Sequence, residues 1–196
     1  QYIVEVSPPG ITPVHDDELR PQPLRIDFSY DYETVIESPD MPPEPSVAAL
    51  ALLDKPLTSG IRMEPSVPGE WRWSNDRSLI FTPEQDWPAE QQYSVQFSPE
   101  LFREGVRLDS DEAEFTTPGF SAGLEAIEFY QDPVDRKTRR VIATLGFSHA
   151  VDSASLEKQL TLAMRPSGAG IKVAPVNYGF SISYDKHHRK AYLHSA

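Results

Sequence analysis

The stretch of sequence that decides the fold is residues 71–83, which read WRWSNDRSLIFTP. Trp71 and Trp73 lie on one side of an alternating pattern, residues 74–77 supply a turn, and residues 79–81 form an apolar return. Alternation with a period of two is typical of a half-buried strand, and Asn and Asp favour tight turns because they tolerate left-handed backbone. The stretch therefore predicts a β-hairpin whose two tryptophans share a face.

Short alternating segments continue on both sides of this hairpin. Apolar and polar residues alternate in residues 24–29, 92–97, 112–117 and 180–184, with turn-forming residues between them. Residues 47–53 form an apolar run that is compatible with either a buried strand or a turn of helix, because so short a run has no decisive period. Closely spaced strands without long helices predict an all-β protein built as two tandem antiparallel β-sandwich domains of the Ig-like type.

Chain length and the positions of proline and glycine suggest where these domains meet. A chain of 196 residues holds one large domain or two small ones. Pro118 and Gly119 end the alternating pattern of the first part. We expect domains at 1–118 and 119–196, and we expect the second to be truncated at its C-terminus because its last strand pattern stops abruptly.

Three further local features are predicted. Residues 37–45 carry four prolines and are expected to form a loop. Gly146 interrupts a strand pattern over residues 141–147 and suggests a β-bulge. A short helix is expected within residues 150–159, capped by Asp152 or Ser153.

Composition narrows the classes of function. The formal charge of −12 disfavours nucleic acid and anionic membrane surfaces, which bind clusters of Lys and Arg. The absence of cysteine excludes disulfides, thiolate nucleophiles, zinc–thiolate sites and thioester chemistry within these residues. No run of eighteen apolar residues occurs, so no membrane-spanning segment is predicted.

Tryptophans and histidines are the side chains most suggestive of binding. Trp71, Trp73 and Trp87 invite comparison with sugar-stacking platforms, but we favour burial in the core, with Trp87 filling a corner before Pro88. His187 and His188 are adjacent, so on a strand they point in opposite directions and do not chelate one ion easily. A solvated hairpin tip is the preferred interpretation for that pair and for the nearby His194.

Acidic residues give no catalytic signature. Residues 109–114 resemble a calcium loop superficially, but the EF-hand pattern needs Gly sixth and Glu twelfth, where this chain has Glu114 and Phe120. Glycosidases use two carboxylates at a set separation, but with 30 acidic residues in the chain the sequence does not single out any pair as catalytic. We therefore predict no enzyme, no catalytic residue, and no cofactor-binding or metal-binding residue. The first strand, around residues 4–6, is a candidate edge for addition of a partner strand.

The motifs of the deciding hairpin and its surroundings resemble a known family. Residues 71–83, the corner Asp86-Trp87-Pro88-Ala89 and the strand start Tyr93-Ser94-Val95 are similar to the Ig-like modules of bacterial alpha-2-macroglobulins. Residues 147–152, FSHAVD, resemble a strand end of the next such domain.

This resemblance implies an N-terminal part of a periplasmic or cell-envelope protein whose full-length form traps proteases, with any membrane anchor outside these residues. The implied role of this segment is a non-catalytic structural and interaction module. Its expected partners are neighbouring domains of the same chain, envelope proteins and, for the full-length protein, target proteases. A carbohydrate-binding or adhesin-type Ig-like module is the alternative.

Overall fold

The fold is described by a computed structural model covering residues 1–31, 46–131, 133–134, 139–164 and 174–196. The chain divides into two compact units, Gln1–Gly119 and Phe120–Ala196, which we call the first and second units. Both are built from antiparallel sheets, which confirms the predicted all-β fold class. The domain limits 1–118 and 119–196 remain a prediction, because compact packing does not by itself show independent folding.

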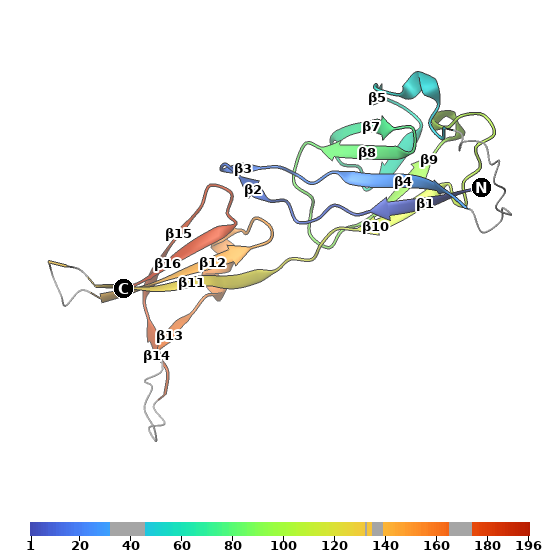
Figure 1. The fold of residues 1–196 in the computed structure, drawn as a ribbon. Helices are drawn as coiled ribbons and strands as arrows, with labels where there is room; N and C mark the ends of the chain where they lie inside the picture. Colours follow the sequence, from blue (N-terminus) through green and yellow to red (C-terminus); the bar gives the residue numbers. More distant parts are fainter. Residues whose placement is uncertain (32–45, 132, 135–138, 165–173) are drawn as a thin grey trace, which may run out of the picture. The chain divides into compact units, whose positions relative to one another are not determined.

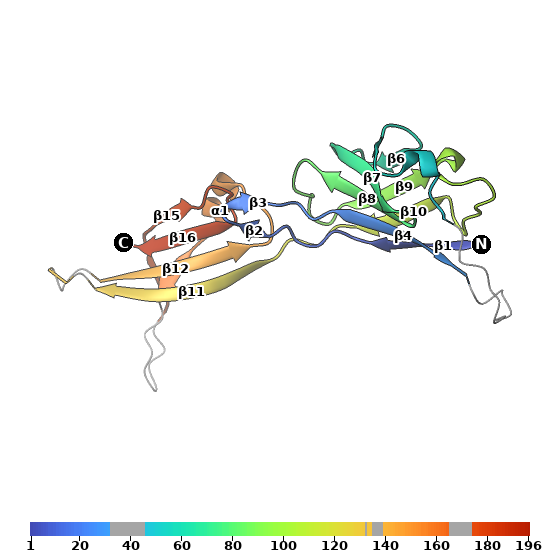
Figure 2. The ribbon, with the colours of Figure 1, turned by 45° about the horizontal axis from the view of Figure 1, so that its top comes forward.

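The first unit contains two sheets that face each other (Figures 1 and 2). The five-stranded sheet runs in the order β1 (Tyr2–Ser7), β4 (Leu24–Tyr30), β8 (Ser78–Pro83), β7 (Gly69–Asn75), β5 (Pro56–Leu57). The three-stranded sheet runs in the order β10 (Glu112–Thr116), β9 (Gln92–Phe97), β6 (Ile61–Glu64). Inward residues of both sheets form one buried cluster, so this unit is a β-sandwich.

The predicted hairpin is β7 paired with β8. Trp71 lies opposite Phe81 and Trp73 opposite Leu79, and a bulge between Trp73 and Asn75 precedes the turn. The Asn75 side chain accepts a hydrogen bond from the Arg77 backbone N–H at 2.8 Å, which closes the turn as expected for Asn at this position.

The second unit is organised around one four-stranded sheet. Its strands run in the order β11 (Ala122–Gln131), β12 (Arg139–Phe147), β16 (Lys190–Ser195), β15 (Phe180–Tyr184). A separate two-stranded sheet, β13 (Leu162–Met164) with β14 (Val176–Tyr178), lies beside it (Figure 1).

The helix of the second unit is α1, Ser153–Gln159, and its predicted cap is confirmed. The Asp152 carboxylate accepts a hydrogen bond from the Ser155 backbone N–H at 2.8 Å. Hydrogen bonding from the Ser155 side chain, together with this backbone bond, lowers the pKa of Asp152, because the charged form is the better acceptor. The Tyr184 hydroxyl donates to the Ser153 carbonyl at 3.4 Å, which places α1 over the β15 side of the sheet.

The predicted bulge at Gly146 was wrong in one respect. The irregularity lies on the partner strand, between Leu124 and Ala126, so that Glu125 is the extra residue. Gly146 stands next to it, and its missing side chain leaves space that the Glu125 carboxylate fills.

The remaining elements are short. Residues 47–53 contain a 3-10 turn, η2 (Leu50–Leu52), rather than a strand. A second 3-10 turn is η3 (Pro99–Leu101), and a small hairpin pairs β2 (Val14–His15) with β3 (Glu18–Leu19). The proline-rich loop predicted over residues 37–45 lies outside the described residues. No helix within the described ranges is long and apolar enough to cross a membrane.

Candidate interaction surfaces

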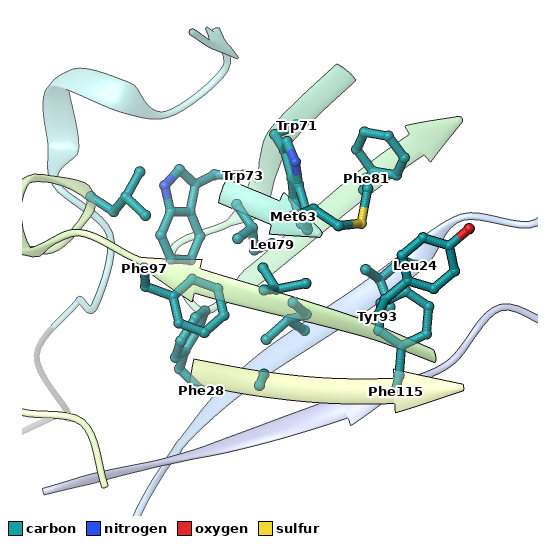
Figure 3. Packing of buried hydrophobic residues seen from close by; sticks show 14 of the residues in the cluster. Leu24, Phe28, Met63, Trp71, Trp73, Leu79, Phe81, Tyr93, Phe97 and Phe115 are labelled. Carbon is teal, nitrogen blue, oxygen red and sulfur yellow. The ribbon is translucent and has the colours of Figure 1, made fainter. Parts of the chain in front are cut away.

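The tryptophans of the deciding hairpin lie in the core of the first unit (Figure 3). Trp73 is 1% exposed and its ring lies 5.5 Å from that of Phe28. Trp71 is also buried, with its ring 5.0 Å from that of Phe81. The predicted burial of these two rings is confirmed, and neither offers a platform on which a sugar could stack.

Trp87 fills the corner between the two sheets of the first unit. Its ring contacts those of Phe81, Tyr93 and Phe115 at centroid distances of 5.8, 5.4 and 5.8 Å. Its indole N–H donates to the Gln22 carbonyl at 2.7 Å, so the one polar atom of the ring is satisfied. The predicted corner role of Trp87 is confirmed.

The acidic turn at residues 109–114 ties the first strand to the rest of its unit. The Asp109 carboxylate accepts a hydrogen bond from the Val4 N–H at 3.1 Å, and the Asp109 N–H donates to the Tyr2 carbonyl at 2.8 Å. The Tyr2 N–H donates in turn to the Arg107 carbonyl at 2.8 Å. The outer edge of β1 is therefore occupied from Tyr2 to the Val4 N–H, and the suggestion that this edge accepts a partner strand was wrong at Val4. For Glu5 and Val6 it stays a prediction.

The histidines at 187 and 188 lie at the predicted hairpin turn between β15 and β16. The His188 ring stacks on Tyr184 at 5.2 Å with an angle of 8° between the ring planes. The Asp185 carboxylate accepts hydrogen bonds from the backbone N–H groups of Arg189 and Lys190, both at 2.7 Å, and so holds the turn. Within the part of the chain that the structure describes, no group of three or more His, Asp or Glu side chains is arranged to hold a metal ion.

One polar network of the first unit is partly buried. Asp27 on β4 accepts hydrogen bonds from the Arg25 guanidinium at 2.7 Å and from the Ser78 hydroxyl. Burial alone raises the pKa of Asp27, but the bonds from Arg25 and Ser78 and the Arg25 charge outweigh it and hold the pKa below its usual value. The network joins β4 to β8 and has no free group aimed at a ligand.

The main sheet of the second unit has one strongly apolar face. Residues directly opposite in register share a face, and one such row crosses three strands from Ile127 through Ala143 to Leu193. Leu193 is 6% exposed, whereas Ile127 is 64% exposed. The same apolar face is thus covered at β16 and uncovered at β11.

We call the uncovered part the open apolar face and define it by its exposed or half-exposed side chains: Leu124, Ile127, Phe129 and Val141. Leu124 and Phe129 are 55% and 65% exposed. A cleft of about 440 Å³ separates the end of this face from β13 and β14, with Leu162 and Tyr178 on its far wall.

Sequence reasoning missed this surface, because the prediction of two β-sandwich domains implies that the inward residues of both domains are buried. That implication holds for the first unit and is wrong for β11. The signal available in the sequence was the apolar pattern of Leu124, Ile127 and Phe129, which marks a face without saying what covers it.

Comparisons with known proteins find sequence similarity to bacterial alpha-2-macroglobulins. It is 31% identical over 193 residues to an alpha-2-macroglobulin homolog of Yersinia pestis, an alignment that covers 98% of this chain and 9% of that protein. It is 36% identical over 116 residues to an alpha-2-macroglobulin of Pasteurella multocida, covering 58% of this chain and 6% of that protein. A third, from Rickettsia conorii, is 28% identical over 111 residues. No family model and no solved structure matches significantly. The chain spans less than a tenth of the length of each of these three relatives.

Proposed function

Because this chain belongs to the bacterial alpha-2-macroglobulin family, we propose that it is a non-catalytic structural and interaction module of a long cell-envelope protein that traps proteases. The observation that carries the proposal is the alignment with the Yersinia pestis protein, which runs through both units and not through one motif alone. Its relatives are alpha-2-macroglobulins, which supports this kind of protein, and the antiparallel β fold supports a structural part of it.

The fold suits a spacer that keeps its shape. In the first unit the aromatic residues that carry the family resemblance are buried in the core. Trp73, Phe81 and Tyr93 are each at most 2% exposed. Two packed antiparallel sheets make a rigid body whose loops are free to vary. The proposed role of this module is to fix the positions of neighbouring domains and to provide surfaces that they bind. We place this role in the periplasm or elsewhere in the cell envelope.

The proposal is tested by comparing the 196-residue chain with the full-length protein that contains it. A trap blocks a captured protease from a large protein substrate while a small chromogenic substrate still reaches its active site. We expect this behaviour from the full-length protein with chymotrypsin, and no inhibition by the 196-residue chain at any molar ratio. Stoichiometric inhibition by the chain alone would refute the role of a non-inhibitory module.

A pair of variants in the full-length protein makes the test specific to this segment. Trp73→Ala removes a buried ring of the core, whereas Gln85→Ala changes an exposed side chain of the same unit. We expect Trp73→Ala to lower the fraction of protease trapped and Gln85→Ala to leave it unchanged. Equal trapping by both variants, with the first unit shown to be unfolded in Trp73→Ala, would mean that trapping does not need this module.

A further inference from the structure

The open apolar face of the second unit lacks a covering layer among the described residues. α1 reaches the face on the β15 side through the Tyr184 hydroxyl, and the cleft next to β13 and β14 adjoins Phe129 and Val141. Neither covers the middle of β11, where Ile127 is 64% exposed. Soluble proteins rarely leave adjoining large apolar side chains of one sheet face in water, and such patches mark interaction sites.

The strand order indicates which kind of layer is missing. An Ig-type sandwich places its first, second, fifth and fourth strands in one sheet and opposes them with its third strand and two later ones. If the short pair β13 and β14 is counted as the third strand, the order β11, β12, β16, β15 matches the first of these sheets, and the pair corresponds to the start of the opposing sheet. In the described part of this unit nothing occupies the place of the two later strands.

We propose that the open apolar face is the seat of further β-strands of the same long polypeptide, which extend the sheet of β13 and β14 and cover Leu124, Ile127 and Phe129. The inference rests on the proposed function, in which this chain is one segment of a much longer protein. It adds the surface through which the second unit is joined to the rest of that protein, and the kind of segment that binds there.

Linkage within one long polypeptide favours strands of the same chain as the occupant. The Yersinia pestis relative is more than ten times as long as its aligned part, so polypeptide of the right kind is abundant. A covalently linked segment meets the face at an effective concentration of about millimolar, which a separate protein rarely reaches. A second copy of this chain is the competing occupant, and the mass of the 196-residue chain in the experiment below distinguishes it.

The absence of cysteine makes this face open to a direct test. Ile127→Cys places a thiol on the open apolar face, and Glu128→Cys places one on the neighbouring residue, which points to the opposite face and is exposed. Both variants are made in the 196-residue chain and in the full-length protein. The rate of maleimide labelling at each site is followed by mass spectrometry of its peptide.

In the 196-residue chain we expect the two thiols to react at similar rates. In the full-length protein we expect Ile127→Cys to react slower by roughly tenfold or more, because labelling then waits for local opening, and Glu128→Cys to keep its rate. Equal labelling of both sites in the full-length protein overturns the inference, since the face then stays open for a separate partner. Protection of Ile127→Cys already in the 196-residue chain, together with a dimeric mass, also overturns it, since a second copy is then the occupant.

The outcome does not depend on the proposed function being correct. Labelling needs no protease, so a full-length protein that fails to trap can still show protection at residue 127. A full-length protein that traps but leaves residue 127 reactive refutes only the covering strands.

Discussion

The first and second units are both built from antiparallel strands, yet the inward face is buried in the first unit and partly exposed in the second. In the first, eighteen hydrophobic residues form one buried cluster, fourteen of them from the two sheets. In the second, Ala191 and Leu193 are the buried hydrophobic residues among those described. A strand sequence with apolar alternation therefore produces a core only where a second layer faces it.

The two units also differ in charge. Residues 1–119 carry 23 acidic and eight basic side chains, a formal charge of −15, whereas residues 120–196 carry seven and ten, a formal charge of +3. A strongly charged body repels its copies and stays soluble, and the weakly charged unit is the one with exposed apolar surface. The interaction surface lies where charge repulsion is smallest.

The largest expected effect is on the core of the first unit. Trp73→Ala removes a ring that is 1% exposed, and we expect a loss of about 3–5 kcal/mol in the free energy of unfolding. All three tryptophans of the chain lie in this unit, so the emission of Trp71 and Trp87 follows its urea transition selectively. An unchanged midpoint would mean that this core is less tightly packed than its burial indicates.

The row that crosses the sheet of the second unit sharpens the comparison. Leu193→Ala, at the covered end, should cost about 2–4 kcal/mol, and Ile127→Ala, at the uncovered end, at most about 0.5 kcal/mol. Hydrogen exchange of β12 and β16 peptides in the 196-residue chain measures both. Because separate domains unfold separately, we expect the tryptophan transition of the first unit to stay in place in both variants. A shift of that transition would contradict the predicted domain limits.

Much of the first unit was predictable from sequence because its signals are local. The Trp71–Trp73 alternation and the turn at Asn75 lie within one hairpin, and Trp87 lies in a short corner motif. Asp109 was not predictable in the same way. Its carboxylate accepts a hydrogen bond from the N–H of Val4, which is 105 residues away in the sequence. No local pattern around residue 109 predicts so distant a partner.

In the second unit, features that depend on residues far apart in the sequence could not be predicted from local patterns. Alternation identified the apolar face of β11, but whether a face is covered depends on segments elsewhere in the chain. The bulge near Gly146 was assigned to the wrong strand for a similar reason, because a bulge belongs to a pair of strands and the pairing was unknown. The cap at Asp152 was predictable, since it needs only the three residues that follow.

Two glycines test how firmly each unit is packed. A Cβ on Gly69 in β7 meets the Phe81 ring and lies 2.5 Å from the Thr82 carbonyl oxygen, neither of which can move freely. A Cβ on Gly146 in β12 meets the carboxylate end of Glu125, which can swing aside. We expect Gly69→Ala to cost about 1–3 kcal/mol, and Gly146→Ala to cost clearly less. Urea titration for the first and hydrogen exchange for the second measure the two costs, and similar values would contradict the difference in packing.

Asp27 gives the first unit a dependence on pH. Its pKa is lower in the folded chain than the value of about 3.9 in an unfolded one, so its contribution is present above that value and is lost as pH falls through the folded pKa. We expect Asp27→Asn to lower the stability of the first unit by about 1 kcal/mol at neutral pH. The gap between wild type and variant should close as the solution is acidified below about pH 4. A gap that stays constant as the pH falls further below about 4 would show that hydrogen bonding, and not the charge of Asp27, carries its contribution.

The smallest expected effect concerns the ion pair of the second unit. Lys190 and Glu125 are 2.8 Å apart, but their side chains are 47% and 45% exposed, so water and salt screen the attraction. The hydrogen bond to Glu125 raises the pKa of Lys190, so any contribution is present at neutral pH and is lost only as pH rises through that raised value. We expect Lys190→Ala to change the stability of the second unit by at most about 0.5 kcal/mol, and the change to vanish in about 1 M salt. If hydrogen exchange instead shows a cost as large as that of Asp27→Asn and insensitive to salt, the pair is shielded from water, and the second unit is closed more tightly than the exposure of β11 indicates.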